Sequence, residues 1–326
     1  MLSSEDTAVA LSFPTWGYST TMAMRARRSN GARREAIEGY LYISPWILGF
    51  LLFTLGPMLA SLYFSFTRYN VLSTPHFTGL TNYTYIFTRD RLFWIALQRT
   101  ATYAVATVVL GVTGSLLLAV LLDQRLKAVS LLRTLYFLPS LTPIVASALL
   151  WGWIFQPQYG VMNFLLGKLG IPGPGWLQSP DWAMPALVIL ALWGGLGGGR
   201  MIIFIAGLQG VPNELYEAAN MDGASTFSRF FKITLPLLTP TIFFNLVLGI
   251  IGSFSVFSVA YVATGGGPVD ATYFYVFHIF NRAFKDLDMG YAAALAWIFF
   301  GILLVFTLIQ FAIQKYWVYY EEGPRT

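Results

Sequence analysis

Residues 209–236 read QGVPNELYEAANMDGASTFSRFFKITLP, a polar stretch between two long apolar segments. Pro212 suits the first turn of a helix, and Asn213 can cap it. Gly223 permits a sharp turn that a residue with a β-carbon would resist, and Ser225 can cap a second helix. The stretch therefore predicts two short helices joined by a tight turn outside the membrane. Helical periodicity alone fits equally well an amphipathic connector that rests on the bilayer surface.

The flanking sequence is that of a membrane protein. Of the 326 residues, 56% are hydrophobic and 11% are charged, against about 45–50% and about 25% in soluble domains. Six apolar segments reach the roughly 20 residues that a helix needs to cross a bilayer. They lie at 41–66, 93–122, 131–155, 183–208, 237–262 and 289–314. The sequence predicts an all-α membrane protein with six transmembrane helices, the third of them kinked at Pro139 and Pro143.

The distribution of Lys and Arg predicts the orientation. With the N-terminus inside, 12 of the 20 lie on the cytoplasmic side, 7 lie outside, and Arg200 lies within the fourth segment. This bias predicts that both termini lie in the cytoplasm. We expect three regions: a cytoplasmic tail at 1–39, mostly disordered, a membrane domain at 40–315 that includes the helices at 212–232, and a cytoplasmic tail at 316–326.

Several function classes are excluded by composition. The chain has no cysteine and only two histidines, His76 and His278, so we expect no metal site and place both histidines in external loops or at an interface. The net charge of +5 is explained by loop orientation and does not indicate nucleic acid. The six apolar segments contain no Asp or Glu, which argues against an ion-coupled carrier, because such carriers place carboxylates at membrane depth.

The polar stretch resembles a known signature. It contains Glu217-Ala-Ala, Gly223, Ile233 and Leu235-Pro236, seven positions over twenty residues. This spacing resembles the EAA motif of ABC importer permeases. Further segments, at 77–83, 133–139, 206–209, 261–268 and 290–294, resemble the maltose-, lactose- and glycerol-3-phosphate-type branch, and in particular the first of its two permeases. The resemblance covers about residues 40–315.

The resemblance implies a type I ABC importer permease fold and a set of partners. These partners are a second permease that completes a heterodimer, a dimer of ABC ATPases, and an extracytoplasmic sugar-binding protein, with lipid around the spans. The helix–turn–helix would dock on the ATPase. The residues implied in that coupling are Leu215, Glu217, Ala218, Ala219, Asp222, Gly223 and Ala224. The chain has no phosphate-binding loop of the Gly-x-x-x-x-Gly-Lys-Ser/Thr type. We therefore expect it to be non-catalytic and to bind no cofactor, with ATP and Mg²⁺ on the ATPase.

The fifth segment offers a candidate substrate path. Asn245, Gly249, Gly252 and Ser253 fall on one side of a helix there. The glycines either leave room for a sugar or let a neighbouring helix pack closely, and the packing interpretation is the stronger. Asn245 is the best single candidate for sugar contact, because an intramembrane amide needs a hydrogen-bonding partner.

The fourth segment adds Trp193 and a glycine run ending at Gly199 and Arg200. Glycines at this density indicate an unwound stretch, which at membrane depth must line protein or water. Trp193 either stacks on a sugar or, more simply, belongs to the outer aromatic belt. Arg200 faces the cavity, snorkels to an interface, or pairs with the partner permease. In the first case an anionic sugar, phosphorylated or uronic, becomes the expected cargo.

The sequence thus predicts a permease subunit that imports a sugar or oligosaccharide, sugar phosphates included, powered by partner ATPases. Two alternatives stay open. One is an ABC importer permease for a non-sugar cargo, and the other is an ion-coupled secondary transporter.

Overall fold

The computed structural model describes residues 30–124 and 128–319, and side chains from residue 33 onward. The chain divides into two compact units, with the boundary between Met58 and Leu59. Most of the predicted N-terminal tail, 1–29, and the last seven residues, 320–326, lie outside the described residues.

The described part of the first unit belongs to one apolar helical run, which ends in the second unit. Helix α1 (Asn30–Phe50) continues through a π-helical turn, η1 (Leu51–Leu55), into α2 (Gly56–Ser65). The last ten residues of the predicted tail, 30–39, are helical, and Arg34 bonds Glu38 at 2.9 Å one turn later. Large apolar side chains on this helix are exposed, as in Tyr42 (87%) and Phe53 (82%), which suits a helix surrounded by lipid.

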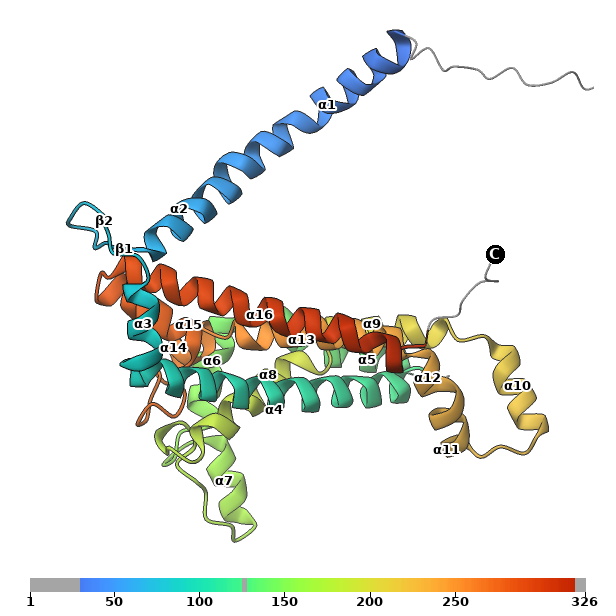
Figure 1. Cartoon of the computed structure of the whole chain (residues 1–326). Helices are drawn as coiled ribbons and strands as arrows, with labels where there is room; N and C mark the ends of the chain where they lie inside the picture. The colour runs from blue at the N-terminus through green and yellow to red at the C-terminus, as the bar shows by residue number, and fades with distance from the viewer. Residues whose placement is uncertain (1–29, 125–127, 320–326) are drawn as a thin grey trace, which may run out of the picture. The chain divides into compact units, whose positions relative to one another are not determined.

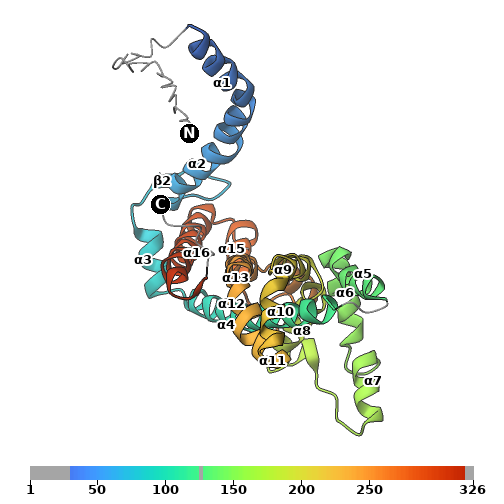
Figure 2. The same cartoon turned by 90° about the vertical axis from the view of Figure 1, so that its right-hand side faces the viewer.

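The second unit is built around α4 (Arg91–Leu122), whose 32 residues rise about 48 Å. A two-stranded ribbon, β1 (Thr67–Arg68) antiparallel to β2 (His76–Phe77), and α3 (Thr81–Thr88) precede it. Helix α4 packs against α8, α9 and α13, and α16 (Met289–Trp317) packs against α13 and α15 (Figures 1 and 2). The remaining elements in chain order are α5 (Val129–Phe137), η2 (Leu138–Leu141), α6 (Ile144–Ile154), α7 (Val161–Lys168), η3 (Trp176–Gln178), α8 (Ala183–Gly195), α9 (Gly199–Gln209), α10 (Asn213–Met221), α11 (Thr226–Arg229), η4 (Phe230–Thr234), α12 (Leu235–Leu237), α13 (Thr239–Phe254), α14 (Ser258–Ala263), α15 (Tyr275–Phe280) and η5 (Asn281–Lys285).

The predicted six spans correspond to four long apolar helices and two bent pairs. The third span bends by 97° between η2 and α6. Thr142, which precedes Pro143, is extended (ψ 130°), because the proline ring disfavours the helical conformation in the residue before it. The fourth span bends by 50° between α8 and α9, in the predicted glycine run.

The two bends pack against each other. A Cβ at Gly197 would overlap the carbonyl of Tyr136, and a Cβ at Gly198 would lie 3.0 Å from the Cβ of Ser140. Glycine is therefore required here for close approach. The Ser115 hydroxyl on α4 donates to the Leu196 carbonyl at 2.9 Å, which gives the broken helix a partner for one freed backbone group.

Candidate functional site

The polar stretch forms a helical hairpin, α10 and α11, joined by a turn at Gly223. Gly223 has φ +72°, the left-handed conformation that glycine adopts without steric cost. Its N–H bonds the Asn220 carbonyl at 3.1 Å, and the Ala224 N–H bonds the Ala219 carbonyl at 2.9 Å. These two bonds form a Schellman motif, the standard way to end a helix on glycine.

The hairpin's N-caps are partly as predicted. The Ser225 hydroxyl accepts from the Ser228 N–H at 3.2 Å and caps α11 as expected. The prediction that Asn213 caps α10 is wrong. Asn213 is the first helical residue, and Pro212 stands at the cap without a side-chain hydrogen bond.

The hairpin lies near the C-terminal end of α4, and polar bonds join its two helices to each other and to η4. The Tyr216 and Thr234 hydroxyls lie 2.9 Å apart. Arg229 donates to Asn220 and, at 3.0 Å, to Thr226. In Figure 1 the hairpin extends past this end of the helices, and Figure 2 views the helices from the hairpin's side. The hairpin is therefore an internally bonded unit rather than a loose connector.

Most of the predicted coupling residues are exposed on this hairpin. Leu215, Glu217, Ala218, Asp222 and Gly223 are exposed, and Ala219 and Ala224 are half-buried. Glu217 has no hydrogen bond or ion pair with any described residue. Sequence reasoning missed Met221, which is 89% exposed at the end of α10, and Phe227 on α11 is 74% exposed. Exposed apolar side chains of this size next to a free carboxylate are typical of a protein-binding surface.

A cavity of about 490 Å³ opens between α4, the α8–α9 bend and the α13–α14 segment. This volume lies within the range of small-molecule sites, about 300–1,000 Å³. Glycines and hydroxyl-bearing side chains dominate the wall, and none of its residues is Asp or Glu. Its polar side chains are those of Tyr103, Thr107, Ser140, Arg200, Ser253, Ser255 and Ser258.

The structure brings some predicted path residues to this cavity and leaves others out. Gly199, Arg200, Gly252 and Ser253 line it. Asn245, expected to be the best contact, does not. It is 1% exposed, and its amide donates to the Thr241 carbonyl in its own helix at 2.9 Å. That local bond already supplies the hydrogen-bonding partner that an intramembrane amide needs.

Gly249 and Trp193 also lie off the cavity wall. Gly249 packs near Arg200, where an added Cβ would lie 3.2 Å from Nη2. Trp193 meets Trp151 edge to face at 5.8 Å and lines a separate apolar cavity beside α4 and α5. Neither residue lines the polar cavity.

Sequence reasoning missed the contribution of α4 to this site. Tyr103, Thr107 and Gly111 all line the cavity. Thr107 donates to the Ser253 hydroxyl at 3.1 Å, and a Cβ at Gly111 would overlap Nη1 of Arg200. Their spacing of four residues, which places them on one face of α4, was the available signal.

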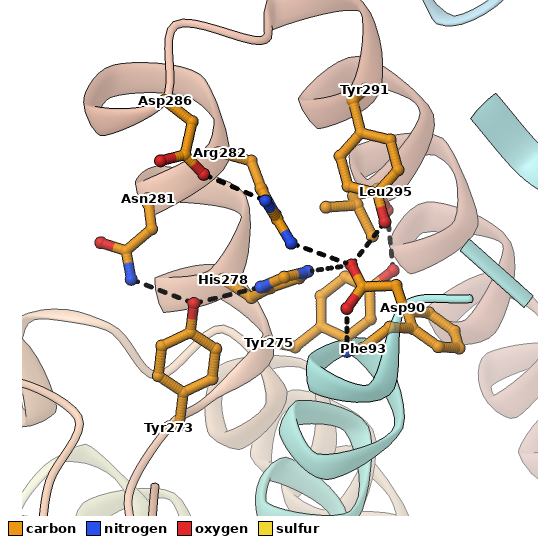
Figure 3. Close-up of polar contacts among 10 residues, drawn as sticks. All are labelled: Asp90, Phe93, Tyr273, Tyr275, His278, Asn281, Arg282, Asp286, Tyr291 and Leu295. Atoms are coloured by element: carbon orange, nitrogen blue, oxygen red, sulfur yellow. Dashed lines mark hydrogen bonds and ion pairs between the residues drawn. The ribbon is translucent and has the colours of Figure 1, made fainter. Parts of the chain in front are cut away.

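A second polar cluster lies at the N-terminal end of α4, opposite the hairpin (Figure 3). Asp90 caps α4 by accepting from the Phe93 N–H at 3.1 Å. Its other oxygen accepts from the Tyr291 hydroxyl and lies 3.0 Å from His278 Nε2 and 3.5 Å from Arg282. The placement of His278 in a loop or interface is wrong, because its side chain is fully buried on α15.

The electrostatics of this cluster favour an ionised carboxylate. Burial alone would raise the pKa of Asp90, but the hydrogen bonds from His278 and Tyr291 outweigh it and hold that pKa well below its usual range. The cluster ties α4, α15 and α16 together at one end of the spans. Among the described residues no group of three or more His, Asp or Glu side chains is arranged to hold a metal ion.

The part of the chain that contains the hairpin and the cavity is similar to known membrane transport proteins. Residues 111–317 match the family described as binding-protein-dependent transport system inner membrane component. Over 300 residues the chain is 44% identical to a probable ABC transporter permease protein, YesP, of Bacillus subtilis, covering 91% of this chain and 96% of that one. It is 35% identical to the trehalose/maltose transport system permease protein MalF of Thermococcus litoralis, covering 87% and 95%.

A solved structure shares the fold. A chain of the bacterial ABC transporter that imports the acidic polysaccharide alginate superposes with a TM-score of 0.77 at 23% identity, covering 87% of this chain and 97% of that one. The fold is thus that of an ABC importer permease.

Proposed function

Because the chain belongs to the family of binding-protein-dependent transport system inner membrane components, we propose that it forms, with a second similar permease, the path by which an importer moves a sugar or oligosaccharide into the cell. The saccharide assignment is supported by the relative named for trehalose and maltose transport. It is also supported by a cavity whose wall is rich in hydroxyls, since such groups exchange hydrogen bonds with sugar hydroxyls.

The energy comes from partner ATPases that dock on the α10–α11 hairpin. The sequence holds no phosphate-binding loop, so ATP and Mg²⁺ belong to those partners and this chain is a non-catalytic subunit. The hairpin supplies a free carboxylate at Glu217, exposed apolar side chains and the small Ala218, which lets a partner approach closely. A docking surface with these features would fit an apolar groove on the ATPase whose rim is positively charged.

The observation that carries the proposal is the continuity of the hairpin with the cavity wall. Helix α10 begins four residues after α9 ends at Gln209, and α9 carries Arg200 into the cavity. On the other side, α11 runs through η4 and α12 into α13, which carries Gly252 and Ser253. A displacement of the hairpin therefore moves two cavity-lining helices. For such coupling to drive transport, ATP and cargo must bind with unequal affinity to the two conformations of the transporter, before and after this displacement.

The orientation follows from the same assignment. The hairpin, both termini and the excess of Lys and Arg lie on the cytoplasmic side of the bacterial or archaeal plasma (inner) membrane. The Asp90 cluster and the loop at 264–268 then lie outside, where the binding protein delivers its cargo. A non-sugar cargo is the alternative within the family, and the hydroxyl-rich wall favours the sugar.

ATPase activity of the assembled complex tests this function. The complex is formed from this chain, the second permease and the ATPase encoded beside it, with the cognate binding protein added. We expect saccharide-loaded binding protein to stimulate ATP hydrolysis several-fold over unloaded protein, because only the loaded form favours the ATP-bound state. Stimulation by an amino acid or a polyamine, with none by any saccharide, would contradict the proposed cargo.

A further inference from the structure

Arg200 places a positive charge on the cavity wall without a negative partner. The cavity-lining helices α4, α8, α9, α13 and α14 contain no Asp or Glu. Within the described parts of the chain, no hydrogen bond or ion pair joins the Arg200 guanidinium to another residue. Charged side chains at membrane depth are costly and mark a functional site when they face a cavity.

Two neighbouring helices make room for this guanidinium. Nη1 lies where a Cβ at Gly111 of α4 would stand, and Nη2 lies 3.2 Å from the position of a Cβ at Gly249 of α13. Larger residues at these points would displace the head group from the gap between α4 and α13. The glycines therefore leave room for the head group at the wall, in the gap between the two helices.

The surrounding groups reinforce a preference for negative charge. Gly198 and Gly199 line the same wall at the start of α9, where the backbone N–H groups of a first helical turn have no partner within the helix. Tyr103, Thr107 and Ser253 add hydroxyls that can hydrogen-bond a polyhydroxylated ligand. The wall thus carries the positive charge of Arg200 and further hydrogen-bond donors, and it contains no carboxylate.

We infer that Arg200 binds an anionic group of the cargo, a carboxylate or a phosphate, so that the transported saccharide is an acidic one. The inference rests on the proposed importer function and narrows its substrate class. A guanidinium pairs with both carboxylate and phosphate through two parallel N–H donors. The ring hydroxyls of the same saccharide are then met by Tyr103, Thr107 and Ser253.

Uptake into proteoliposomes holding the full complex, with binding protein and ATP supplied, tests this inference. Three probes are compared: oligogalacturonate of two to four units, malto-oligosaccharide of the same length, and trehalose 6-phosphate. We expect uptake of the carboxylated or the phosphorylated probe, and the difference between these two identifies the anionic group. Arg200→Gln should reduce that uptake by about 10- to 100-fold, the range for a lost hydrogen bond to a charged group, and Arg200→Lys should retain part of it.

Two further variants separate binding from assembly. Arg89→Gln removes one exposed positive charge outside the cavity and should leave uptake unchanged. Gly111→Ala keeps the charge but displaces the flexible end of Arg200, so it too should lower uptake of the anionic probe while the complex still assembles. If Arg200→Gln prevents assembly and Gly111→Ala leaves uptake normal, Arg200 pairs with the second permease and the inference is wrong.

The outcomes also distinguish this inference from the proposed function. Uptake of malto-oligosaccharide alone, or equal uptake of the anionic probe by wild type and Arg200→Gln, overturns only the assignment of an acidic cargo. Uptake of none of the three probes, together with stimulation of the complex's ATP hydrolysis by an amino acid or a polyamine, contradicts the saccharide importer itself and the inference with it.

Discussion

Replacing Glu217 by lysine is expected to reduce ATP-driven uptake to background while leaving the membrane helices folded. Glu217 is exposed on α10 and has no hydrogen bond or ion pair with a described residue, so its loss removes no such internal bond. Exposed substitutions of this kind usually change the free energy of unfolding by less than about 0.5 kcal/mol. At a docking surface, in contrast, reversing a charge places like charges together, which costs several kcal/mol.

The measurement is uptake into proteoliposomes, together with the amount of ATPase that co-purifies with the permeases. Glu217→Gln removes the charge without reversing it and should give an intermediate loss. Glu35→Lys is a matched charge reversal at another exposed glutamate, on α1, and should have little effect. Normal uptake by the Glu217→Lys complex would show that α10 is not the coupling helix.

Asp90→Ala is expected to destabilise the fold far more than any substitution on the exposed face of the α10–α11 hairpin. The Asp90 carboxylate accepts bonds from Tyr291, His278 and the Phe93 N–H. Removing one member of a buried, hydrogen-bonded charged cluster typically costs about 3–5 kcal/mol, because the remaining groups are left unpaired. The helix α4 also loses its N-cap, which contributes about 1 kcal/mol.

Thermal unfolding of the purified complex in detergent measures this loss. Asp286→Ala is the matched control, since Asp286 bonds the same Arg282 at 3.2 Å but is half-exposed, and exposed pairs contribute about 1 kcal/mol or less. A melting temperature for Asp90→Ala equal to that of the control would contradict the role given to the cluster.

The same cluster predicts a pH dependence. The folded structure lowers the pKa of Asp90, so this carboxylate stabilises the fold fully above its unfolded pKa of about 3.9. The stabilisation is lost as the pH falls below that value toward the folded pKa. The difference in stability between wild type and Asp90→Ala should therefore shrink as the pH falls below about 4.

Sequence reasoning predicts the parts of the fold that local chemistry determines. Gly223 is recognisable as a turn because only a residue tolerant of positive φ ends a helix so sharply, and φ is +72°. The break before Pro143 and the irregular glycine run at 194–199 are likewise local effects of proline and glycine. Hydropathy alone locates the six spans, since each needs about 20 apolar residues.

The features that sequence reasoning misses depend on contacts between distant segments. Asp90 and His278 are 188 residues apart, and no local pattern places one beside the other. That Gly111 leaves room for the Arg200 guanidinium can be recognised only once α4 is packed against α9. The expectation for Asn245 assumes that its amide needs a partner outside its own helix, whereas the Thr241 carbonyl one turn earlier accepts from it.

The central claim is that this chain is one of two passive membrane subunits of an ATP-driven importer. It is tested most directly by saccharide uptake into proteoliposomes that contain the permease pair, with and without the ATPase subunits. We predict uptake only when the ATPase, ATP and loaded binding protein are all present, and no uptake from an imposed proton or sodium gradient. Gradient-driven uptake by the permeases without ATPase would contradict the account and identify an ion-coupled carrier.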